Sequence, residues 1–566
     1  MDTRIKDRDW MDKPYIHYLI IAVVCLFAFF INNQIIPADL MESRNLATAQ
    51  EMVRTGNYLI PTMNGELRLE KPPLPTWIAA GVEHISPGNL IVQRYASGLM
   101  ASLMVVFLYL IVLKLTRHRK TALFSGVVLA TCFNIVLMGR TASWDIYCHS
   151  FMLVAIYFIV LALNKEGAQW KNFLLAGLLM GLSFLSKGPV SFYALLLPFI
   201  IAYSITFRPS LKKKVKPLIA MILLCVIISF WWNVYLLLSH PEMMMRVLHK
   251  ESSSWINYNV RPWYYYWQFA AEAGIWALFL ITSFTLLARW RHRGSIFNFS
   301  GQGKKDVFTF AFTWFAASLL LLSAIPEKKT RYLLPILVPG AILIGLYFYS
   351  CLGNLNTRLQ KIVFRINATL IGVILLAIPV LLYIKFYRAD EMTLGWFILS
   401  TVLSWGLCFY LLKSTYAKRI KVENVFWGIV LTMVMVEGVC LYPIGDMFIN
   451  ADRKSIRLLR ENKQVQGLPF YYNQEEDLRM ELVYEANQTL KPMDTTNDSL
   501  VSANAPFVFV SSEPAETVFA GKNLTIKYIG RFDNNWRKTG SKRYNPSLVR
   551  HVAIVRNNQS STISEE

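Results

Sequence analysis

Charged side chains cluster in the polar segment that follows the first hydrophobic stretch of the chain. Asp39, Glu42 and Arg44 lie at its start, and Glu70 and Lys71 follow within the sequence GELRLEKPPLPTW. Acids and bases placed side by side on a loop at a membrane face are what an enzyme acting on a lipid-linked phosphate requires. The two prolines after Lys71 make the chain rigid, which suits a loop that holds two charges in fixed positions.

The same residues also have structural interpretations. Asp39 and Glu42 have the spacing of a capping box, in which two acids satisfy free backbone donors at a helix start. The run that follows has an apolar face at helical spacing and predicts an amphipathic helix lying on the membrane, with Arg44, Thr48 and Glu51 on its polar face. Asp39 is therefore either a cap or a base, and the Glu70–Lys71 pair is either functional or a surface ion pair of little energetic weight.

Further charges stand at the ends of later hydrophobic stretches. Asp145 follows the third stretch, Lys187 precedes Gly188, and the sequence EKKTRYLLP carries Lys328, Lys329 and Arg331. Ionisable groups at membrane depth are costly and tend to mark sites or pathways. With Lys71 these cations form a set whose natural partner is a phosphate or pyrophosphate. The alternatives are a helix N-cap for Asp145 and a side chain reaching the membrane interface for Lys187.

Composition assigns the chain to the polytopic α-helical membrane proteins. Of its 566 residues 54% are hydrophobic and 17% charged, and the mean hydropathy is +0.37. Apolar runs of about 18–25 residues are long enough to cross a bilayer. About thirteen such runs are predicted, at 15–33, 93–116, 121–139, 146–163, 172–185, 189–206, 218–238, 264–288, 307–325, 333–350, 366–386, 394–412 and 425–443.

Basic residues in alternate connections predict the orientation. Dense runs of Lys and Arg occur at 117–120, 208–216, 289–293 and 413–421, and they share one side if the N-terminus is cytoplasmic. These loops and anionic membrane lipids account for the net charge of +22 without any nucleic acid. The first apolar run has no clear cleavage pattern, and the seven cysteines show no disulfide framework.

Two domains are expected. Residues 1–444 form the transmembrane domain, with a periplasmic loop at 34–92, and residues 445–566 form a small periplasmic α/β domain. In the latter, 451–462 and 475–486 are predicted helices, and 506–510, 524–530 and 551–555 are predicted strands. No catalytic constellation stands out in this C-terminal domain, so a structural or acceptor-positioning role is expected for it.

The first loop resembles that of a known family. MESRNLATAQEM (41–52) and GNYLIPTMNGELRLEKPPLPTWIAA (56–80) are similar to the first periplasmic loop of the lipid A aminoarabinose transferases. These enzymes are relatives of the protein O-mannosyltransferases among the GT-C glycosyltransferases. Matches follow in order at Asp145, Lys187–Gly188, Pro262–Tyr265 and Lys329–Tyr332, so the resemblance covers about 440 residues and implies a GT-C fold.

The resemblance implies a polyprenyl-phosphate sugar as donor and a site on the outer face of the bacterial inner membrane. Arg44, Lys71, Lys187 and Tyr332 match residues at the donor phosphate, with Lys329 and Arg331 as neighbouring cations. Glu70 matches a residue at the reaction centre, where some members hold a divalent metal with a later histidine, here His249. Two departures stand out: Met41 replaces the usual Asp before Glu42, and the alignment of His249 needs a gap.

The expected activity is transfer of a hexose or pentose from this donor to lipid A or a related glycolipid. Asp39, Glu42, Glu70 and Asp145 are the candidate catalytic carboxylates. A hydroxyl acceptor would need Glu42 or Asp39 as general base, whereas a phosphate acceptor needs no base. The alternatives are a protein O-glycosyltransferase with the same donor class and a lipid-linked sugar transporter, although the sequence has no repeated halves of the transporter kind.

Overall fold

The chain forms two compact units, which are described one by one. The computed structural model describes residues 13–35, 37–286, 307–352, 355, 357–388, 392–446, 449–450 and 453–558. The membrane unit comprises Met1–Asn33, Glu70–Leu74 and Arg94–Pro443, and the loop–tail unit comprises Gln34–Leu69, Pro75–Gln93 and Ile444–Glu566. The first polar loop is thus grouped largely with the C-terminal segment, whereas the sequence suggested a loop belonging to the transmembrane domain.

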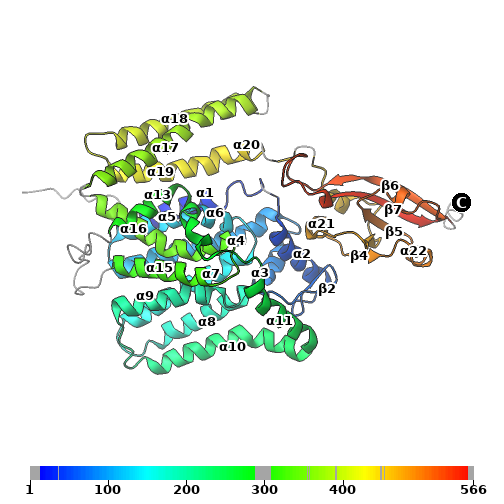
Figure 1. Ribbon diagram of the computed structural model, residues 1–566, viewed down its shortest axis with the longest axis horizontal. Coiled ribbons are helices and arrows are strands. Elements are labelled where there is room, and N and C mark those ends of the chain that lie inside the picture. The colour runs from blue at the N-terminus through cyan, green and yellow to red at the C-terminus, as the bar shows by residue number, and fades with distance from the viewer. Residues whose placement is uncertain are drawn as a thin grey trace, which may run out of the picture. The chain divides into compact units, whose positions relative to one another are not determined.

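Apolar helices build the membrane unit (Figure 1). Helices α7 and α8 form a hairpin against which α10 packs, and α17 and α18 pack as a second hairpin. The helices are α1 (Pro14–Phe29), α4 (Leu90–Thr116), α5 (Arg119–Ala130), α6 (Phe133–Gly139), α7 (Trp144–Asn164), α8 (Trp170–Lys187), α9 (Leu197–Phe207), α10 (Val215–Ser239), α11 (Pro241–Asn257), α12 (Phe269–Glu272), α13 (Ala277–Ser283), α15 (Val307–Ala324), α16 (Leu337–Leu352), α17 (Arg358–Leu382), α18 (Leu394–Thr415), α19 (Val422–Met435) and α20 (Leu441–Asp446).

The expected multi-span architecture is confirmed. Within the described residues, 8 helices are long and apolar enough to cross a membrane, or 9 if the bent pair α5 and α6 is a single span. Three shorter apolar helices, Pro14–Phe29, Phe192–Phe207 and Gly274–Ser283, coincide with predicted runs. The chain is therefore a multi-span membrane protein, while the number thirteen is not confirmed.

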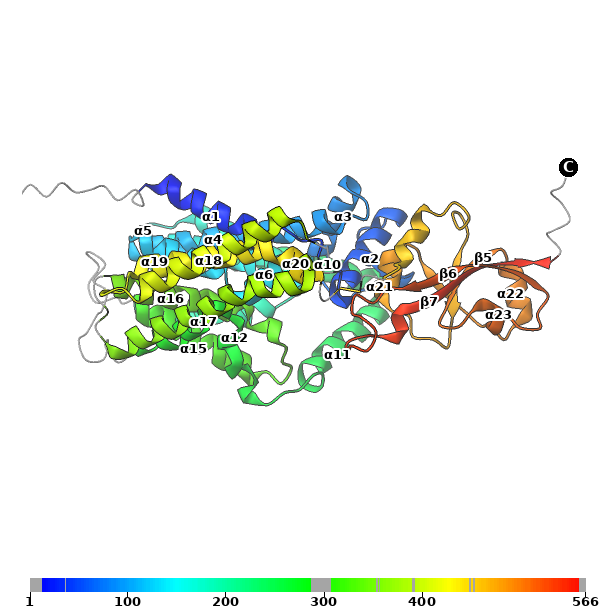
Figure 2. The ribbon, with the colours of Figure 1, turned by 90° about the horizontal axis from the view of Figure 1, so that it is seen from above.

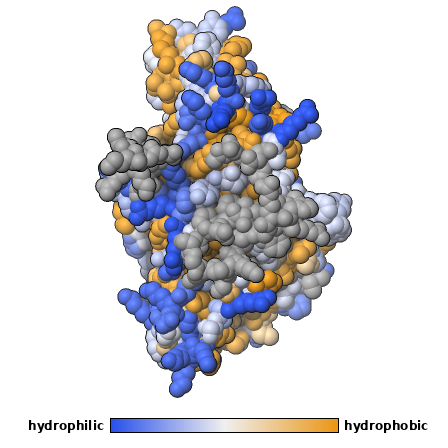
Figure 3. Space-filling model, turned by 90° about the vertical axis from the view of Figure 1, so that its left-hand side faces the viewer, coloured by the Kyte–Doolittle hydropathy of each residue, from blue (hydrophilic) through white to orange (hydrophobic). Residues whose placement is uncertain are grey.

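Hydrophilic side chains gather at the end of the membrane unit where α5 and α10 begin (Figure 3). Exposed cations there include Arg117, Arg119, Lys212 and Lys216. Lys120 forms an ion pair of 3.7 Å with Glu423 at the start of α19, so two of the predicted basic runs lie together. The run at 289–293 lies outside the described residues, and the side of the membrane that this end faces stays a prediction.

The first polar loop contributes two helices and a hairpin to the loop–tail unit. Helix α2 (Leu40–Thr55) ends at Gly56 in a left-handed C-cap, and α3 (Leu74–Ile85) follows the prolines. Between them β1 (Thr62–Met63) pairs with β2 (Glu66–Leu67) in antiparallel register. The turn is Asn64–Gly65 with positive φ at both positions, which is the geometry that a two-residue hairpin favours.

A five-stranded mixed sheet forms the rest of the loop–tail unit, in the order β4-β3-β5-β7-β6. Helices α22 (Asp498–Asn504) and α23 (Ala515–Val518) pack on a phenylalanine-rich core on one face of the sheet (Figure 2). Strands β5 (Phe507–Ser511), β6 (Leu524–Asp533) and β7 (Val549–Asn557) confirm the three predicted strands. The parallel neighbours β3 (Phe470–Asn473) and β4 (Leu490–Met493) were not predicted, and the two predicted helices shrink to Ile456–Glu461, a 3-10 helix, and α21 (Met480–Ala486).

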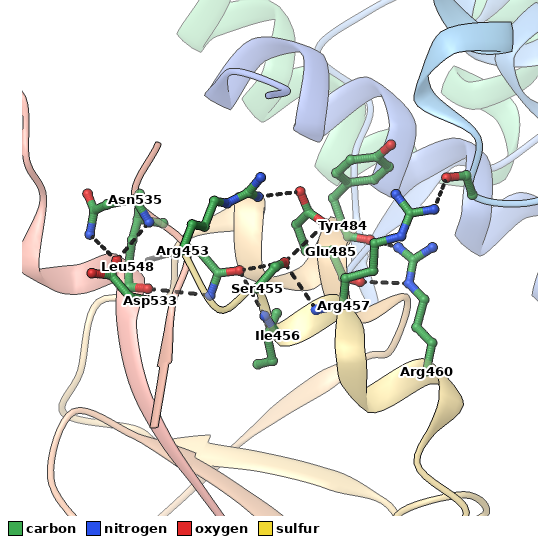
Figure 4. Close-up of polar contacts among 12 residues, drawn as sticks. Arg453, Ser455, Ile456, Arg457, Arg460, Tyr484, Glu485, Asp533, Asn535 and Leu548 are labelled. Carbon is green, nitrogen blue, oxygen red and sulfur yellow. Dashed lines mark hydrogen bonds and ion pairs between the residues drawn. The ribbon is translucent and has the colours of Figure 1, made fainter. Parts of the chain in front are cut away.

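Polar contacts join the first loop to the tail inside this unit. The amide of Asn64 donates to the carbonyl of Leu490 at 2.8 Å and accepts from its N–H at 2.7 Å, across 426 residues of sequence. Arg54 donates to the hydroxyl of Thr489 at 2.6 Å. Arg457 donates to the carbonyl of Gly88 at 2.8 Å, next to the Arg453–Glu485 ion pair (Figure 4). Hydrogen bonds that involve both backbone and side-chain groups therefore attach the first loop to the tail.

Candidate functional site

A buried ion pair stands at the open end of the α7–α8 hairpin. Asp145 lies in the first turn of α7 and Lys187 is the last residue of α8, so the antiparallel hairpin brings them together. The Lys187 ammonium contacts the Asp145 carboxylate, and the two side chains are 8% and 2% exposed. Gly188 ends α8 at φ 70°, a conformation that favours glycine. Each buried charge is compensated by the other, which makes removal of either one costly.

Tyr332 links this pair to a second one. The Lys187 ammonium lies 4.9 Å from the centre of the Tyr332 ring, within cation–π range. On its other side, the Tyr332 hydroxyl donates to Glu327 Oε1 at 3.1 Å. Lys329 pairs with the same oxygen at 2.6 Å and donates to the Tyr332 hydroxyl at 3.3 Å. One aromatic side chain therefore contacts both lysines.

Arg331 adds a third cation. Its guanidinium carbon lies 5.8 Å from the Tyr332 ring, and it interacts electrostatically with Asp145 and Lys187. We refer to the following residues as the Lys187 cluster: Asp145, Lys187, Glu327, Lys329, Arg331 and Tyr332. The cluster lies where α7 begins and α8 ends. With three cations and two carboxylates, it carries one excess positive charge. It can therefore attract an anion such as a phosphate.

Lys328 is not part of this cationic set, in contrast to the sequence-based expectation. It is 2% exposed, and its ammonium donates to the carbonyls of Ile325 at 2.5 Å and Arg261 at 3.2 Å. Burial lowers the pKa of Lys328 below its ordinary value. Because its ammonium donates to carbonyl groups of two connecting segments, Lys328 fastens those segments to each other.

Two acid–base groups, one within the cluster and one beside it, were given no role from the sequence. Glu327 lies within the motif that also supplied Lys329. Nothing in the motif indicates that Glu327 pairs with Lys329 and accepts a hydrogen bond from Tyr332. His149 lies one helical turn after Asp145 and is 1% exposed. Its Nδ1 has no hydrogen-bond partner among the described residues. The spacing of Asp145 and His149 by four residues on an apolar helix is the signal that could have identified the histidine.

Glu70 and Lys71 lie in a short segment of the membrane unit. Glu70 Oε1 forms an ion pair with Lys250 of α11 at 3.2 Å, with the side chains 32% and 68% exposed. An exposed pair of this kind contributes little to stability. Lys71 is half-buried beside it. Glu70 therefore pairs with an exposed cation of α11.

The predicted metal ligands Glu70 and His249 do not form a fitting site. His249 is exposed on α11, one residue before the Lys250 that faces Glu70. Adjacent residues of a helix point about 100° apart, so the His249 side chain does not share the direction of the Lys250 side chain that pairs with Glu70. No group of three His, Cys, Asp or Glu side chains that could hold a metal ion occurs in the described part of the chain.

Asp39 acts as a helix cap in the loop–tail unit. Its Oδ1 accepts the Glu42 N–H at 2.8 Å at the start of α2. The expectation of an amphipathic helix on the membrane is wrong, because both faces of α2 are buried. Of the three residues expected on the polar face, Thr48 and Glu51 are 2% and 4% exposed and Arg44 is half-buried. Glu51 accepts from the Thr62 hydroxyl at 2.6 Å, so this acid holds the β1–β2 hairpin.

Glu42 and Arg44 share the first turns of α2. Glu42 is 1% exposed and interacts electrostatically with Tyr484 of α21. Arg44 is half-buried, and its Nε has no hydrogen-bond partner among the described residues. The predicted site residues thus divide between the units: Asp39, Glu42 and Arg44 are in the loop–tail unit, and the others are in the membrane unit.

Comparisons with known proteins agree with the expected family resemblance. Residues 70–232 match the family model described as dolichyl-phosphate-mannose-protein mannosyltransferase. An undecaprenyl phosphate-alpha-4-amino-4-deoxy-L-arabinose arabinosyl transferase of Yersinia enterocolitica is 25% identical over 341 residues, which is 58% of this chain and 58% of its own length. An uncharacterized protein of Aquifex aeolicus is 25% identical over 397 residues, covering 66% of this chain and 74% of its own.

A solved structure establishes the fold. The crystal structure of ArnT from Cupriavidus metallidurans bound to undecaprenyl phosphate superimposes with a TM-score of 0.66, covering 96% of this chain and 97% of the other at 14% identity. The apo structure of the same protein gives a TM-score of 0.64. The chain therefore has the fold of that structure, and in sequence it is similar to the aminoarabinose transferases and, over residues 70–232, to the protein mannosyltransferases.

Proposed function

We propose that this protein is a glycosyltransferase of the bacterial inner membrane that uses a polyprenyl-phosphate sugar as donor. The acceptor is lipid A or a related envelope glycolipid at the outer face. The family relationship supports the reaction class, since the matching Yersinia enterocolitica relative is named as a transferase with an undecaprenyl-phosphate donor. The alignment spans 58% of that relative, so the assignment of substrates rests on the chemistry of the site.

The Lys187 cluster is the observation that carries the proposal. When a sugar leaves a lipid phosphate, negative charge grows on the phosphate oxygens. Lys187, Lys329 and Arg331 are held by carboxylates and by the Tyr332 ring before any ligand arrives. Preorganised donors of this kind stabilise developing charge without reorganising during the reaction. We assign these three cations to the donor phosphate, with Arg44 and Lys71 as additional predicted contacts.

Three of the candidate carboxylates already have a hydrogen-bond or ion-pair partner, which favours an acceptor that needs no base. Asp39 accepts a backbone N–H, Glu70 pairs with Lys250, and Asp145 pairs with Lys187. A carboxylate engaged by a cation is a weaker base than a solvated one. A phosphate group such as lipid A carries is already ionised at neutral pH and attacks without proton removal.

Protein O-glycosylation is the second candidate, because the matching family model describes a protein mannosyltransferase. A serine or threonine hydroxyl must lose its proton during attack, so this reaction requires a general base. Glu42 is the candidate for that role. Glu42→Gln would then abolish transfer, whereas transfer to a phosphate acceptor would tolerate the change.

Mass spectrometry of envelope lipids and glycoproteins tests the proposal. Cells that carry the gene are compared with cells that lack it. The cells that lack it are also complemented with wild-type protein, with Lys187→Met or with the control Lys171→Met. Lys171 is exposed at the other end of the same helix, α8. We expect a sugar mass on lipid A that disappears without the gene and with Lys187→Met, and persists with Lys171→Met. A hexose on protein instead supports the second candidate, and an unchanged envelope contradicts both.

A further inference from the structure

A basic segment, made of the second half of β6 and the loop that joins β6 to β7, has no part in the proposed reaction. Its base is closed by side chains: the Asp533 carboxylate accepts from Asn535 at 2.9 Å and from the Tyr544 hydroxyl at 2.9 Å. Asn535 and Asn545 exchange two hydrogen bonds of 2.9 and 2.8 Å. The loop between these residues is thus held at both ends and projects from the sheet.

Cations occupy both the end of β6 and the loop that follows it. Between Lys527 and Asn545 the sequence has six Lys and Arg residues and one acid, Asp533. That acid is engaged in closing the loop and is not available to neutralise the tip. The exposed cations are Lys527, Arg531, Lys538, Lys542 and Arg543. We call residues 527–545, which comprise the second half of β6 and the loop after it, the basic loop; it carries an excess of five positive charges.

The chain path limits how far this loop can lie from the end of a membrane span. The carbonyl of Trp536 accepts the Asn450 N–H at 2.8 Å, and the Lys454 carbonyl accepts the Asp533 N–H at 3.0 Å. Asn450 follows Pro443, the end of the last apolar span, by seven residues. Seven residues extend at most about 25 Å. The base of the basic loop therefore stays within that distance of the bilayer, whatever the arrangement of the two units.

Aromatic residues flank the cations. Arg537 stacks on Trp536, with 3.8 Å between the guanidinium carbon and the ring centre. Tyr544 closes the loop, and Tyr528 is exposed on β6. Trp and Tyr beside Lys and Arg are typical of segments that lie at the headgroup level of a membrane.

We propose that the basic loop binds the anionic phospholipid headgroups of the bilayer and holds the loop–tail unit at the membrane surface. Anionic headgroups complement a loop with five excess charges, and the tether to the last span keeps the loop within their reach. A juxtamembrane basic residue strengthens such binding by about fivefold. This inference requires only that the chain spans a membrane, so it stands apart from the proposed glycosyl transfer.

A fluorophore sensitive to polarity tests the proposal in the full-length protein. All seven native cysteines are buried, so an introduced exposed cysteine can be labelled selectively. Ser541→Cys places the label on the basic loop, and Ser499→Cys places a control label on α22, where Ser499 is also exposed. Each protein is reconstituted in nanodiscs of neutral phosphatidylcholine with increasing phosphatidylglycerol.

We expect the emission at position 541 to shift to the blue as phosphatidylglycerol increases. The emission should return to its value in neutral nanodiscs when salt is raised enough to screen the charges. Lys538→Gln/Lys542→Gln should lower the ratio of bound to unbound loop roughly 20-fold. The matched control Lys463→Gln/Lys491→Gln removes two exposed charges elsewhere in the unit and should leave the ratio unchanged. The label at position 499 should not respond and reports on folding.

Three results would overturn the proposal. The first is equal emission at position 541 in neutral and anionic nanodiscs, and the second is equal loss in the two double variants. The third is a response in neutral nanodiscs to inorganic phosphate alone, which would indicate a site for a free anion in place of a membrane surface.

Discussion

The pairing of Lys187 with Asp145 predicts that substitutions of the two residues change the free energy of unfolding and the transfer activity in different ways. Lys187→Met removes the ammonium and leaves the Asp145 carboxylate, which is 2% exposed, without its partner. Removing one member of a buried pair typically lowers the free energy of unfolding by about 3–5 kcal/mol. The lost cation–π contact with Tyr332 is worth about 0.5–2 kcal/mol and is contained in that range.

The double variant Asp145→Asn/Lys187→Met removes both charges while keeping similar side-chain volumes. A buried pair replaced by neutral groups of similar shape often costs little. We therefore expect the double variant to regain most of the stability that either single variant loses. The coupling free energy between the two positions should be about 2 kcal/mol or more, because the residues are in direct contact.

Transfer activity should follow a different order. If Lys187 stabilises the leaving phosphate, its loss lowers kcat by about 100- to 1000-fold, the usual effect of removing one preorganised donor. The double variant then remains as inactive as Lys187→Met, although it is more stable. Lys171→Met should behave as wild type in both measurements.

Both quantities can be measured on the same purified protein. Unfolding in mixed micelles is followed by the reactivity of the seven buried cysteines, and sugar transfer is followed in proteoliposomes. Recovery of wild-type transfer by the double variant would refute the phosphate role and leave Lys187 with a purely structural one. Additive stability losses would refute the pairing itself.

Three further predictions concern the loop–tail unit. Asp39→Asn should keep both the α2 cap and transfer activity, whereas Asp39→Ala should cost about 1 kcal/mol in unfolding experiments; loss of activity in Asp39→Asn would show a catalytic role. Asn64→Gly keeps the left-handed turn but removes two hydrogen bonds to Leu490, so amide exchange in β1–β2 should accelerate as about 1–3 kcal/mol is lost. Burial lowers the pKa of His551, so the unfolded chain binds more protons and stability should fall as pH drops from 7 to 5; His551→Gln should flatten that slope in pH-dependent unfolding.

The membrane fold could be predicted from the sequence because apolar length is a local property. Each predicted run coincides with an apolar helix or a broken one, and the strands β5, β6 and β7 follow from their local composition. The meeting of Asp145 and Lys187 was also within reach, since the two residues bracket one helical hairpin. The count of spans was less accessible, because breaks such as that between α5 and α6, a bend of 64°, depend on packing.

The environment of α2 could not be predicted, because its neighbours come from the other end of the chain. Its expected polar face is buried by contacts of Glu51 with the β1–β2 hairpin and by α21. Likewise, nothing in the sequence distinguishes Lys328 from Lys329. The backbone direction sends the first toward carbonyl groups and the second toward Glu327 and Tyr332.

The charge balance of the Lys187 cluster suits the proposed reaction from donor to product. A glycosyl phosphodiester carries one negative charge, and the phosphate monoester released by transfer carries about −1.5 to −2 at neutral pH. Three cations without carboxylates would repel one another in a low-dielectric setting, whereas Asp145 and Glu327 reduce the excess to one positive charge. The resting cluster thus matches the donor in charge. As the sugar departs and the phosphate gains charge, attraction to the three cations grows, so the interaction is stronger in the transition state than in the bound donor, which is the condition for catalysis.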